Sequence, residues 1–199
     1  MGKAFGVIAK IIKRGGIGVL PTDTIYGIIG SALSKRAVSR VYSVRGRSQK
    51  KPCIILLPSA GALCQFGIIF SKREENIIEK LEKDHVSVVL PCLQKKWAYL
   101  HRGTKTLAFR VVSKRQKKLH ALLQEAGPLI APSANLQGRK PATTVQEARK
   151  YFNDNVDFYV SAGRKLAGKP STVIKIENGK IMVLRGKLSK SQKKIIQTL

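Results

Sequence analysis

The chain of 199 residues is long enough for one domain with a hydrophobic core, and its 43% hydrophobic content is ordinary for a globular protein. Its formal net charge of +27 favours polyanionic partners such as nucleic acid, nucleotide phosphates or acidic membrane surfaces, although a lysine-rich solvated surface explains the charge equally well. No apolar run has the length of a membrane span and the N-terminus differs from a signal peptide, so we expect a cytoplasmic protein without a membrane partner.

Helices and strands alternate along the chain. An amphipathic helix comes first, because Phe5, Ile8 and Ile12 fall on one helical face before Gly15 and Gly16. Further helices are predicted where apolar residues recur at helical spacing, at 34–46, 73–83, 114–127 and 143–152. Strands are predicted at short apolar runs, at 17–20, 53–58, 86–91, 106–112, the start of 128–135, and on either side of the turn signal Asn178–Gly179 within 171–186. The closing hairpin indicates a mixed sheet.

The cysteines and histidines predict no metal centre. Cys53, Cys64 and Cys92 are odd in number and lack CxxC spacing, so we expect buried thiols in a reducing compartment. The histidines lie apart from the cysteines and from one another, and each is interpreted as a surface or packing residue: His85, His101 and His120.

Two phosphate-binding motifs are only partly matched. Residues 163–170 nearly spell a P-loop, but Pro170 occupies the hydroxyl position and a strand-like run follows where a P-loop needs a helix. The glycines at 15, 16 and 18 do not form a dinucleotide fingerprint. Ser133 lacks the GxSxG elbow of a serine hydrolase.

Four polar patches stand where a strand or helix ends. The first, Thr22 to Thr24, interrupts the apolar run from Val19 to Gly30, and an Asx-type turn with a structural Asp23 is a sufficient local account. The other three also have ordinary interpretations as capping, turn or surface residues; they are the cations Arg45, Arg47, Lys50 and Lys51, the pair Ser133 and Asn135, and the pair Ser171 and Arg185.

Together these patches resemble the YrdC family, the threonylcarbamoyl-AMP synthases. The motifs occur in the family's order between about residues 16 and 188: "PTDTIYG", "RGRSQKKP", "TLAFRV", "APSANLQGRKPAT", "AGKPSTVI" and "VLRGK". The resemblance implies a single YrdC-like domain over residues 1–199, in the short single-domain form. Its expected fold is α/β, with a twisted mixed β-sheet flanked by helices (the YrdC/RibB fold) around a large basic concave cavity.

The resemblance also implies an activity and its partners. Such a nucleotidyltransferase makes L-threonylcarbamoyladenylate from L-threonine, bicarbonate or CO2 and ATP, releasing pyrophosphate. This is the first step of the t6A modification of tRNA. Mg2+ carried with ATP is the implied cofactor, because a triphosphate needs few protein carboxylates to hold it. Further implied partners are the downstream t6A-transfer proteins and tRNA or double-stranded RNA at the basic surface.

The family's site residues carry over by position. The implied catalytic residues are Arg45, Arg47, Ser133 and Asn135. The implied threonine contacts are Thr22, Thr24, Arg110, Ser133 and Ser171. The implied ATP contacts are Arg47, Lys51, Thr106, Asn135, Thr143 and Arg185. The chain departs from the family pattern twice, with Arg45 where lysine is usual and Leu56 where some relatives have histidine.

Two other functions remain open from the sequence. A non-catalytic RNA-binding module, such as a ribosome or RNA maturation factor, would show steep salt dependence of RNA affinity and no pyrophosphate release. A carbamoyl-transfer domain of hydrogenase maturation would normally lie in a longer protein with acylphosphatase and zinc-finger segments, neither of which is visible in these 199 residues.

Overall fold

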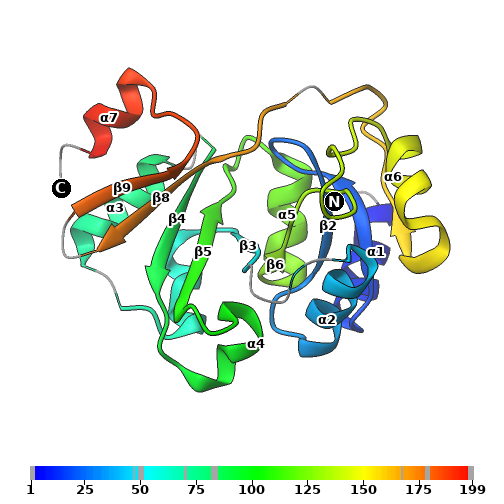
Figure 1. Ribbon diagram of the computed structural model, residues 1–199, viewed down its shortest axis with the longest axis horizontal. Coiled ribbons are helices and arrows are strands. Elements are labelled where there is room, and N and C mark those ends of the chain that lie inside the picture. Colours follow the sequence, from blue (N-terminus) through cyan, green and yellow to red (C-terminus); the bar gives the residue numbers. More distant parts are fainter. Residues whose placement is uncertain are drawn as a thin grey trace.

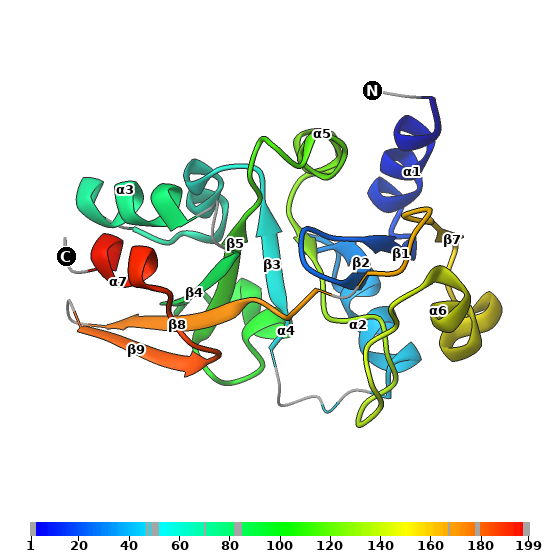
Figure 2. The same cartoon turned by 90° about the horizontal axis from the view of Figure 1, so that it is seen from above.

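The computed structural model describes residues 3–46, 48, 52–69, 71–81, 85–166, 168–177 and 180–196. Helices lie on both sides of a central twisted sheet, and the described ends of the chain lie on opposite sides of it (Figures 1 and 2). None of the helices in these ranges combines the length and apolar character needed to cross a lipid bilayer.

The described residues form one nine-stranded sheet in the order β7-β1-β2-β6-β3-β5-β4-β8-β9. The pairs β1·β7, β3·β5 and β4·β8 are parallel and the other neighbours are antiparallel, which confirms the predicted mixed sheet. The strands are β1 (Ile17–Pro21), β2 (Tyr26–Ser31), β3 (Ile54–Leu57), β4 (Val86–Pro91), β5 (Thr106–Val111), β6 (Leu129–Ile130), β7 (Phe158–Tyr159), β8 (Thr172–Glu177) and β9 (Lys180–Arg185).

The helices begin where the sequence supplies side chains for their free N–H groups. Ser34 accepts a hydrogen bond from Ala37 N at 3.2 Å, and Ser71 and Glu74 form a reciprocal capping box. The α-helices are α1 (Lys3–Lys13), α2 (Lys35–Val44), α3 (Lys72–Lys80), α4 (Ala98–His101), α5 (Lys117–Ala126), α6 (Val145–Phe152) and α7 (Lys190–Ile196). Short 3-10 helices are η1 (Ala60–Phe66), η3 (Lys95–Trp97) and η4 (Asn153–Asn155).

Two apolar clusters cover opposite faces of the sheet around β1 and β2. Helices α1 and α5 lie on one face, where Ile12 and Leu123 pack with Leu20 of β1 (Figure 2). Helix α2 lies on the other face, where Val38 and Val41 join the larger cluster. Because residues alternate between faces along a strand, β1 and β2 each contribute to both clusters. The loops at the strand ends are therefore held by a sheet that is packed on both sides.

Several elements differ from the prediction. Strand β2 was not predicted, because its run contains Gly27 and Gly30, which weaken a strand in isolation. It forms because Leu20 pairs with Gly27 and Ile17 with Gly30 across an antiparallel hairpin. The other unpredicted elements are short or terminal: β7, α4, α7 and the 3-10 helices. The predicted turn at Asn178–Gly179 lies outside the described residues, but β8 and β9 pair antiparallel on either side of it.

The prediction that all three cysteines are buried is wrong for Cys64. Cys53 and Cys92 are buried, whereas Cys64 lies exposed in η1. In that 3-10 helix, Leu63 and Phe66 are directed into the core, and Cys64 falls between them on the solvent side.

Candidate functional site

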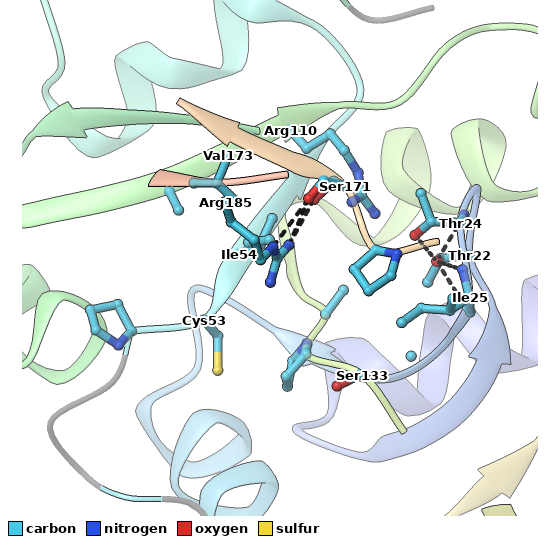
Figure 3. Close-up of a pocket in the computed structure, with 16 residues that line it drawn as sticks. Thr22, Thr24, Ile25, Cys53, Ile54, Arg110, Ser133, Ser171, Val173 and Arg185 are labelled. Atoms are coloured by element: carbon cyan, nitrogen blue, oxygen red, sulfur yellow. Dashed lines mark hydrogen bonds between the residues drawn. The ribbon is translucent and has the colours of Figure 1, made fainter. Parts of the chain in front are cut away.

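A cavity of about 250 Å³ lies between the β1–β2 turn and the β8–β9 hairpin. Figure 3 shows Arg185 at one end, Thr22 and Thr24 at the opposite end, Ser171 and Arg110 between them, and Ser133 below. Two arginines and no carboxylate are among its lining residues, so the charged groups of its described lining are all cationic. The full lining is Thr22, Thr24, Ile25, Gly27, Pro52, Cys53, Ile54, Ala108, Arg110, Ala131, Pro132, Ser133, Pro170, Ser171, Val173 and Arg185.

The turn between β1 and β2 is organised by a hydroxyl group. Thr22 Oγ1 donates to Ile25 O at 2.6 Å and accepts from Thr24 N and Ile25 N, both at 3.3 Å. The predicted Asx-type turn at Asp23 is therefore wrong, because Thr22 makes the turn-closing bonds and the Asp23 carboxylate points elsewhere. Thr22 and Thr24, whose Oγ1 atoms lie 3.3 Å apart, both face the cavity.

Asp23 forms a buried ion pair with Arg110 of β5. Arg110 Nη2 donates to Asp23 Oδ1 at 2.7 Å, and the two side chains are only 4% and 1% exposed. His85 Nδ1 lies 3.0 Å from the second oxygen, Asp23 Oδ2. Burial raises the pKa of Asp23, but the hydrogen bond with His85 and the charge of Arg110 outweigh it, and the pKa lies below its ordinary value. Asp23 is therefore an ionised acceptor at neutral pH.

At the far end of the cavity, Arg185 is anchored to Ser171. Its Nη2 donates to Ser171 O at 2.9 Å and to Ser171 Oγ at 3.1 Å, and its Nε donates to Ser171 O at 3.2 Å. Ser171 Oγ also lies 3.0 Å from Ser87 Oγ of β4. Ser87 is fully buried in β4, so this hydrogen bond fixes the Ser171 hydroxyl from the neighbouring strand.

Arg45 connects the end of α2 to the loop after β6. Its Nε donates to Asn135 O at 3.0 Å, and its Nη2 donates to Asn135 Oδ1 at 3.1 Å and to Ser133 Oγ at 3.4 Å. Asn135 Nδ2 in turn donates to Leu136 O and Arg139 O, each at 2.8 Å. This network fixes the loop that places Ser133 on the cavity wall, and Arg45 itself is only 3% exposed.

The structure brings some predicted site residues together and leaves others apart. All five predicted threonine contacts line the cavity, together with Arg185; Arg45 and Asn135 lie directly behind Ser133. Thr106 and Thr143 are not among the lining residues: their hydroxyls bond to Thr104 Oγ1 at 3.2 Å and Glu147 Oε2 at 3.0 Å. Arg47, Lys50 and Lys51 lie outside the described residues. Leu56 is fully buried in the apolar cluster with α1 and α5 and does not line the cavity.

Sequence reasoning missed two polar residues of this region and the partner of a third. His85 was interpreted as a surface or packing histidine, and its bond to Asp23 joins residues 62 positions apart. Ser87 was not singled out, although a serine inside the apolar strand "VSVVLP" is a signal of a buried hydrogen bond. Asp23 was recognised as structural, but its partner Arg110 was not visible from the local pattern.

The segment between β7 and β8 crosses the molecule from the side of α6 towards β8 (Figure 1). Ala162 N donates to the hydroxyl of Tyr26 at 2.8 Å, and Leu166 N donates to Thr143 O at 2.7 Å. Further along, the backbone of Gly168 lies so close to the carbonyl oxygen of Thr24 that no side chain fits between them. The segment therefore reaches the cavity at Pro170 in close contact with the β1–β2 turn.

Comparisons with known proteins agree with this architecture. The family model Sua5_yciO_yrdC, described as "Telomere recombination", matches residues 10–186. A Methanocaldococcus jannaschii protein whose name includes "threonylcarbamoyl-AMP synthase" is 30% identical over 92% of this chain and 85% of its own length. The structure of Pyrococcus abyssi Sua5 complexed with L-threonine superposes with a TM-score of 0.87 at 25% identity, covering 98% of this chain and 58% of that one. The Escherichia coli YciO structure, at 22% identity, shares the fold with a TM-score of 0.79 over 92% of this chain and 88% of its own.

Proposed function

The chain belongs to the Sua5/YciO/YrdC family, and we propose that it synthesises L-threonylcarbamoyladenylate from L-threonine, bicarbonate or CO2 and ATP, releasing pyrophosphate. This product is the activated intermediate for the t6A modification of tRNA. The chain spans a little over half of the Sua5 structure, 58%, and most of the M. jannaschii protein, 85%. The proposed activity is therefore assigned to the region that this chain shares with those relatives.

The single observation that carries the proposal is the convergence of the five predicted threonine contacts in one cavity. Thr22, Thr24, Arg110, Ser133 and Ser171 come from four separate parts of the chain, and they line one space of about 250 Å³. Threonine has a carboxylate, an amine and a hydroxyl group. A guanidinium can bind the carboxylate, and several hydroxyls can hydrogen-bond to the amine and the hydroxyl.

The reaction needs cations and oriented donors more than a nucleophilic side chain. The threonine amine forms an N–C bond to CO2, or to bicarbonate with loss of water, and gives a carbamate. A carbamate oxygen then forms a bond to the α-phosphorus of ATP while the bond from that phosphorus to the bridging oxygen breaks, and pyrophosphate leaves. Both reactants are anions, so preorganised positive charge stabilises the developing negative charge on the phosphate oxygens.

The lining residues suit separate parts of this reaction. Arg110 would hold the threonine carboxylate, with Thr22 and Thr24 near the rest of the amino acid. Ser133 would position the reacting groups, while Arg45 and Asn135 fix its loop. Arg185, held by Ser171, would carry the phosphate end. Arg47, Lys51, Thr106 and Thr143 remain proposed nucleotide contacts from the family pattern alone.

The cavity fits Mg2+ only as an ion that arrives with the nucleotide. No carboxylate lies on the described cavity wall, and the described residues contain no group of three or more His, Cys, Asp or Glu that could hold a metal. Mg2+ is commonly bound by substrate phosphates with few protein ligands. Bound in this way, it would neutralise charge on the triphosphate.

A contact with tRNA or double-stranded RNA remains a second proposal, supported by positively charged side chains beside the cavity. Beside the substrate cavity, and sharing Thr22 with it, lies a hollow of about 400 Å³ bordered by Arg115, Lys117, Lys118 and Arg164, with no acidic residue in its lining. Cations in such a group attract phosphate backbones with steep salt dependence. Stable contact with downstream t6A-transfer proteins is proposed only from the family role.

The proposed activity is tested with purified protein, ATP, Mg2+ and bicarbonate. Pyrophosphate release is expected to require L-threonine, because the carbamate that attacks ATP forms on its amine. RNA affinity should be measured beside it at two salt concentrations. Salt-sensitive RNA binding without threonine-dependent pyrophosphate release would instead support the non-catalytic RNA-binding module.

Gly168→Ala is expected to raise the KM for threonine by roughly tenfold to a hundredfold, because small displacements in a site have large kinetic effects. A methyl group at Gly168 would overlap the Thr24 carbonyl oxygen, so either the crossing segment or the β1–β2 turn must shift. Steady-state kinetics with threonine varied at saturating ATP provides the measurement. Gly6→Ala is the matched control, since a methyl group there meets no atom within 4 Å. An unchanged KM in Gly168→Ala would show that this contact does not shape the site.

A further inference from the structure

Asp23 lies in the turn between two residues that face the cavity, yet its own carboxylate is not part of the described lining. It is directed behind the cavity wall, where it meets Arg110 of β5 and His85, the residue that precedes β4. The cluster Asp23, Arg110 and His85 thus joins three separate segments of the chain beside the amino-acid end of the cavity.

We propose that Asp23 is a positioning residue that aims the Arg110 guanidinium at the substrate carboxylate, and that His85 holds Asp23 in place from the rim. This inference rests on the proposed function, because it assigns Arg110 a carboxylate ligand. It gives Asp23 a role in substrate affinity beyond neutralising a buried arginine.

The guanidinium of Arg110 is bonded to Asp23 through one of its nitrogens. Nη2 is bonded to Asp23 Oδ1 at 2.7 Å, whereas Nε is buried and has no hydrogen-bond partner among the described residues. Arg110 also lines the cavity, so an incoming carboxylate can reach the guanidinium that Asp23 holds from behind.

His85 keeps Asp23 in the orientation that this arrangement requires. An ionised carboxylate only accepts hydrogen bonds, so the contact of 3.0 Å between His85 Nδ1 and Asp23 Oδ2 requires an N–H on Nδ1. The two carboxylate oxygens are thereby engaged by different partners, and rotation of the Asp23 side chain would break both bonds. His85 is 42% exposed and reaches Asp23 from the solvent side.

A purely structural ion pair would predict a different result from a positioning residue. If Asp23 served only to neutralise a buried arginine, its loss would lower stability and leave substrate selectivity unchanged. A positioning residue instead affects the recognition of the one substrate group that Arg110 contacts. Comparison of L-threonine with L-threoninol, which has a hydroxymethyl group in place of the carboxylate, separates the two cases.

The test is calorimetric binding of both ligands to the full chain and to Asp23→Asn, together with pyrophosphate-release kinetics. For Asp23→Asn we expect threonine affinity to fall by roughly tenfold to a hundredfold, with L-threoninol affinity and the KM for ATP within about twofold of the unsubstituted protein. Unchanged selectivity between the two ligands in a folded variant would overturn the proposal.

Two further variants keep the test decisive. Asp157→Asn is the matched control, because Asp157 forms an ion pair of the same 2.7 Å length with Arg40 away from the cavity, and its threonine affinity should not change. If Asp23→Asn does not fold, His85→Gln decides the question: about threefold or more loss of threonine affinity supports the proposal and no loss overturns it. Failure of the unsubstituted protein to bind threonine would overturn the proposed function as well as this inference, whereas wild-type binding with unaffected variants would overturn the inference alone.

Discussion

Replacing Arg45 with alanine is expected to lower turnover by roughly a hundredfold, because small displacements of the groups that hold a reacting centre have large kinetic effects. Arg45 is 3% exposed and bonds to Ser133 Oγ, Asn135 Oδ1 and Asn135 O at once. Its loss removes a positive charge behind the cavity and releases the loop that carries Ser133. The rate of threonine-dependent pyrophosphate release at saturating substrates measures the effect.

Arg45→Lys is the informative control for this prediction. The resemblance places lysine at this position in most relatives, so the charge alone is expected to restore much of the turnover. A lysine cannot make the forked contact to Ser133 and both oxygens of Asn135, so some loss should remain. Equal turnover in Arg45→Ala and the unsubstituted protein would remove Arg45 from the catalytic machinery, and circular dichroism must show that both variants are folded.

The elements that the sequence predicted correctly are those with a clear local pattern of capping or apolar residues. Helix α2 begins after Ser34 because its side chain accepts from Ala37 N, and β3 is a continuous apolar run that is buried on both faces. Strand β2 was not predicted, because its two glycines are unfavourable in an isolated strand. The pairing with β1 stabilises this strand. Non-local pairing thus overrides local propensity at the point where the site begins.

For the candidate site, too, the residues were predicted but their contacts with distant residues were not. The residues that face the cavity were implied by the family resemblance, which is carried largely by motifs at strand ends, where ligands usually bind in open α/β sheets. The bonds that orient them join residues distant in sequence: Asp23 and Arg110 are 87 positions apart, and Ser87 and Ser171 are 84 apart. No periodicity or local motif reports such pairs. The Asx-turn prediction failed for this reason, since Arg110 and His85 engage the Asp23 carboxylate and leave Thr22 to close the turn.

Arg110→Gln is expected to lower the free energy of unfolding by about 3–5 kcal/mol at neutral pH, because it leaves the carboxylate of Asp23 buried without its cationic partner. The matched control is Arg40→Gln. Arg40 and Asp157 form an ion pair of the same 2.7 Å length, but their side chains are 32% and 36% exposed. Its loss should therefore cost no more than about 1 kcal/mol. Urea unfolding of the three proteins gives the comparison.

The pH dependence of the Arg110→Gln cost identifies its origin. In the unsubstituted protein the pKa of Asp23 is lowered, so its contribution to stability is present above the ordinary aspartate pKa of about 3.9 and is lost as the pH falls. Without Arg110, burial is opposed only by His85 and the turn, and the pKa of Asp23 must rise. The stability difference between the two proteins is therefore expected to shrink as the pH is lowered, because Asp23 of the variant gains a proton at a higher pH than Asp23 of the unsubstituted protein. The double variant Asp23→Asn with Arg110→Gln contains no unpaired charge, and it should be more stable at neutral pH than Arg110→Gln alone. Losses that simply add in the double variant, or a cost that does not change with pH, would contradict a buried unpaired carboxylate as the cause.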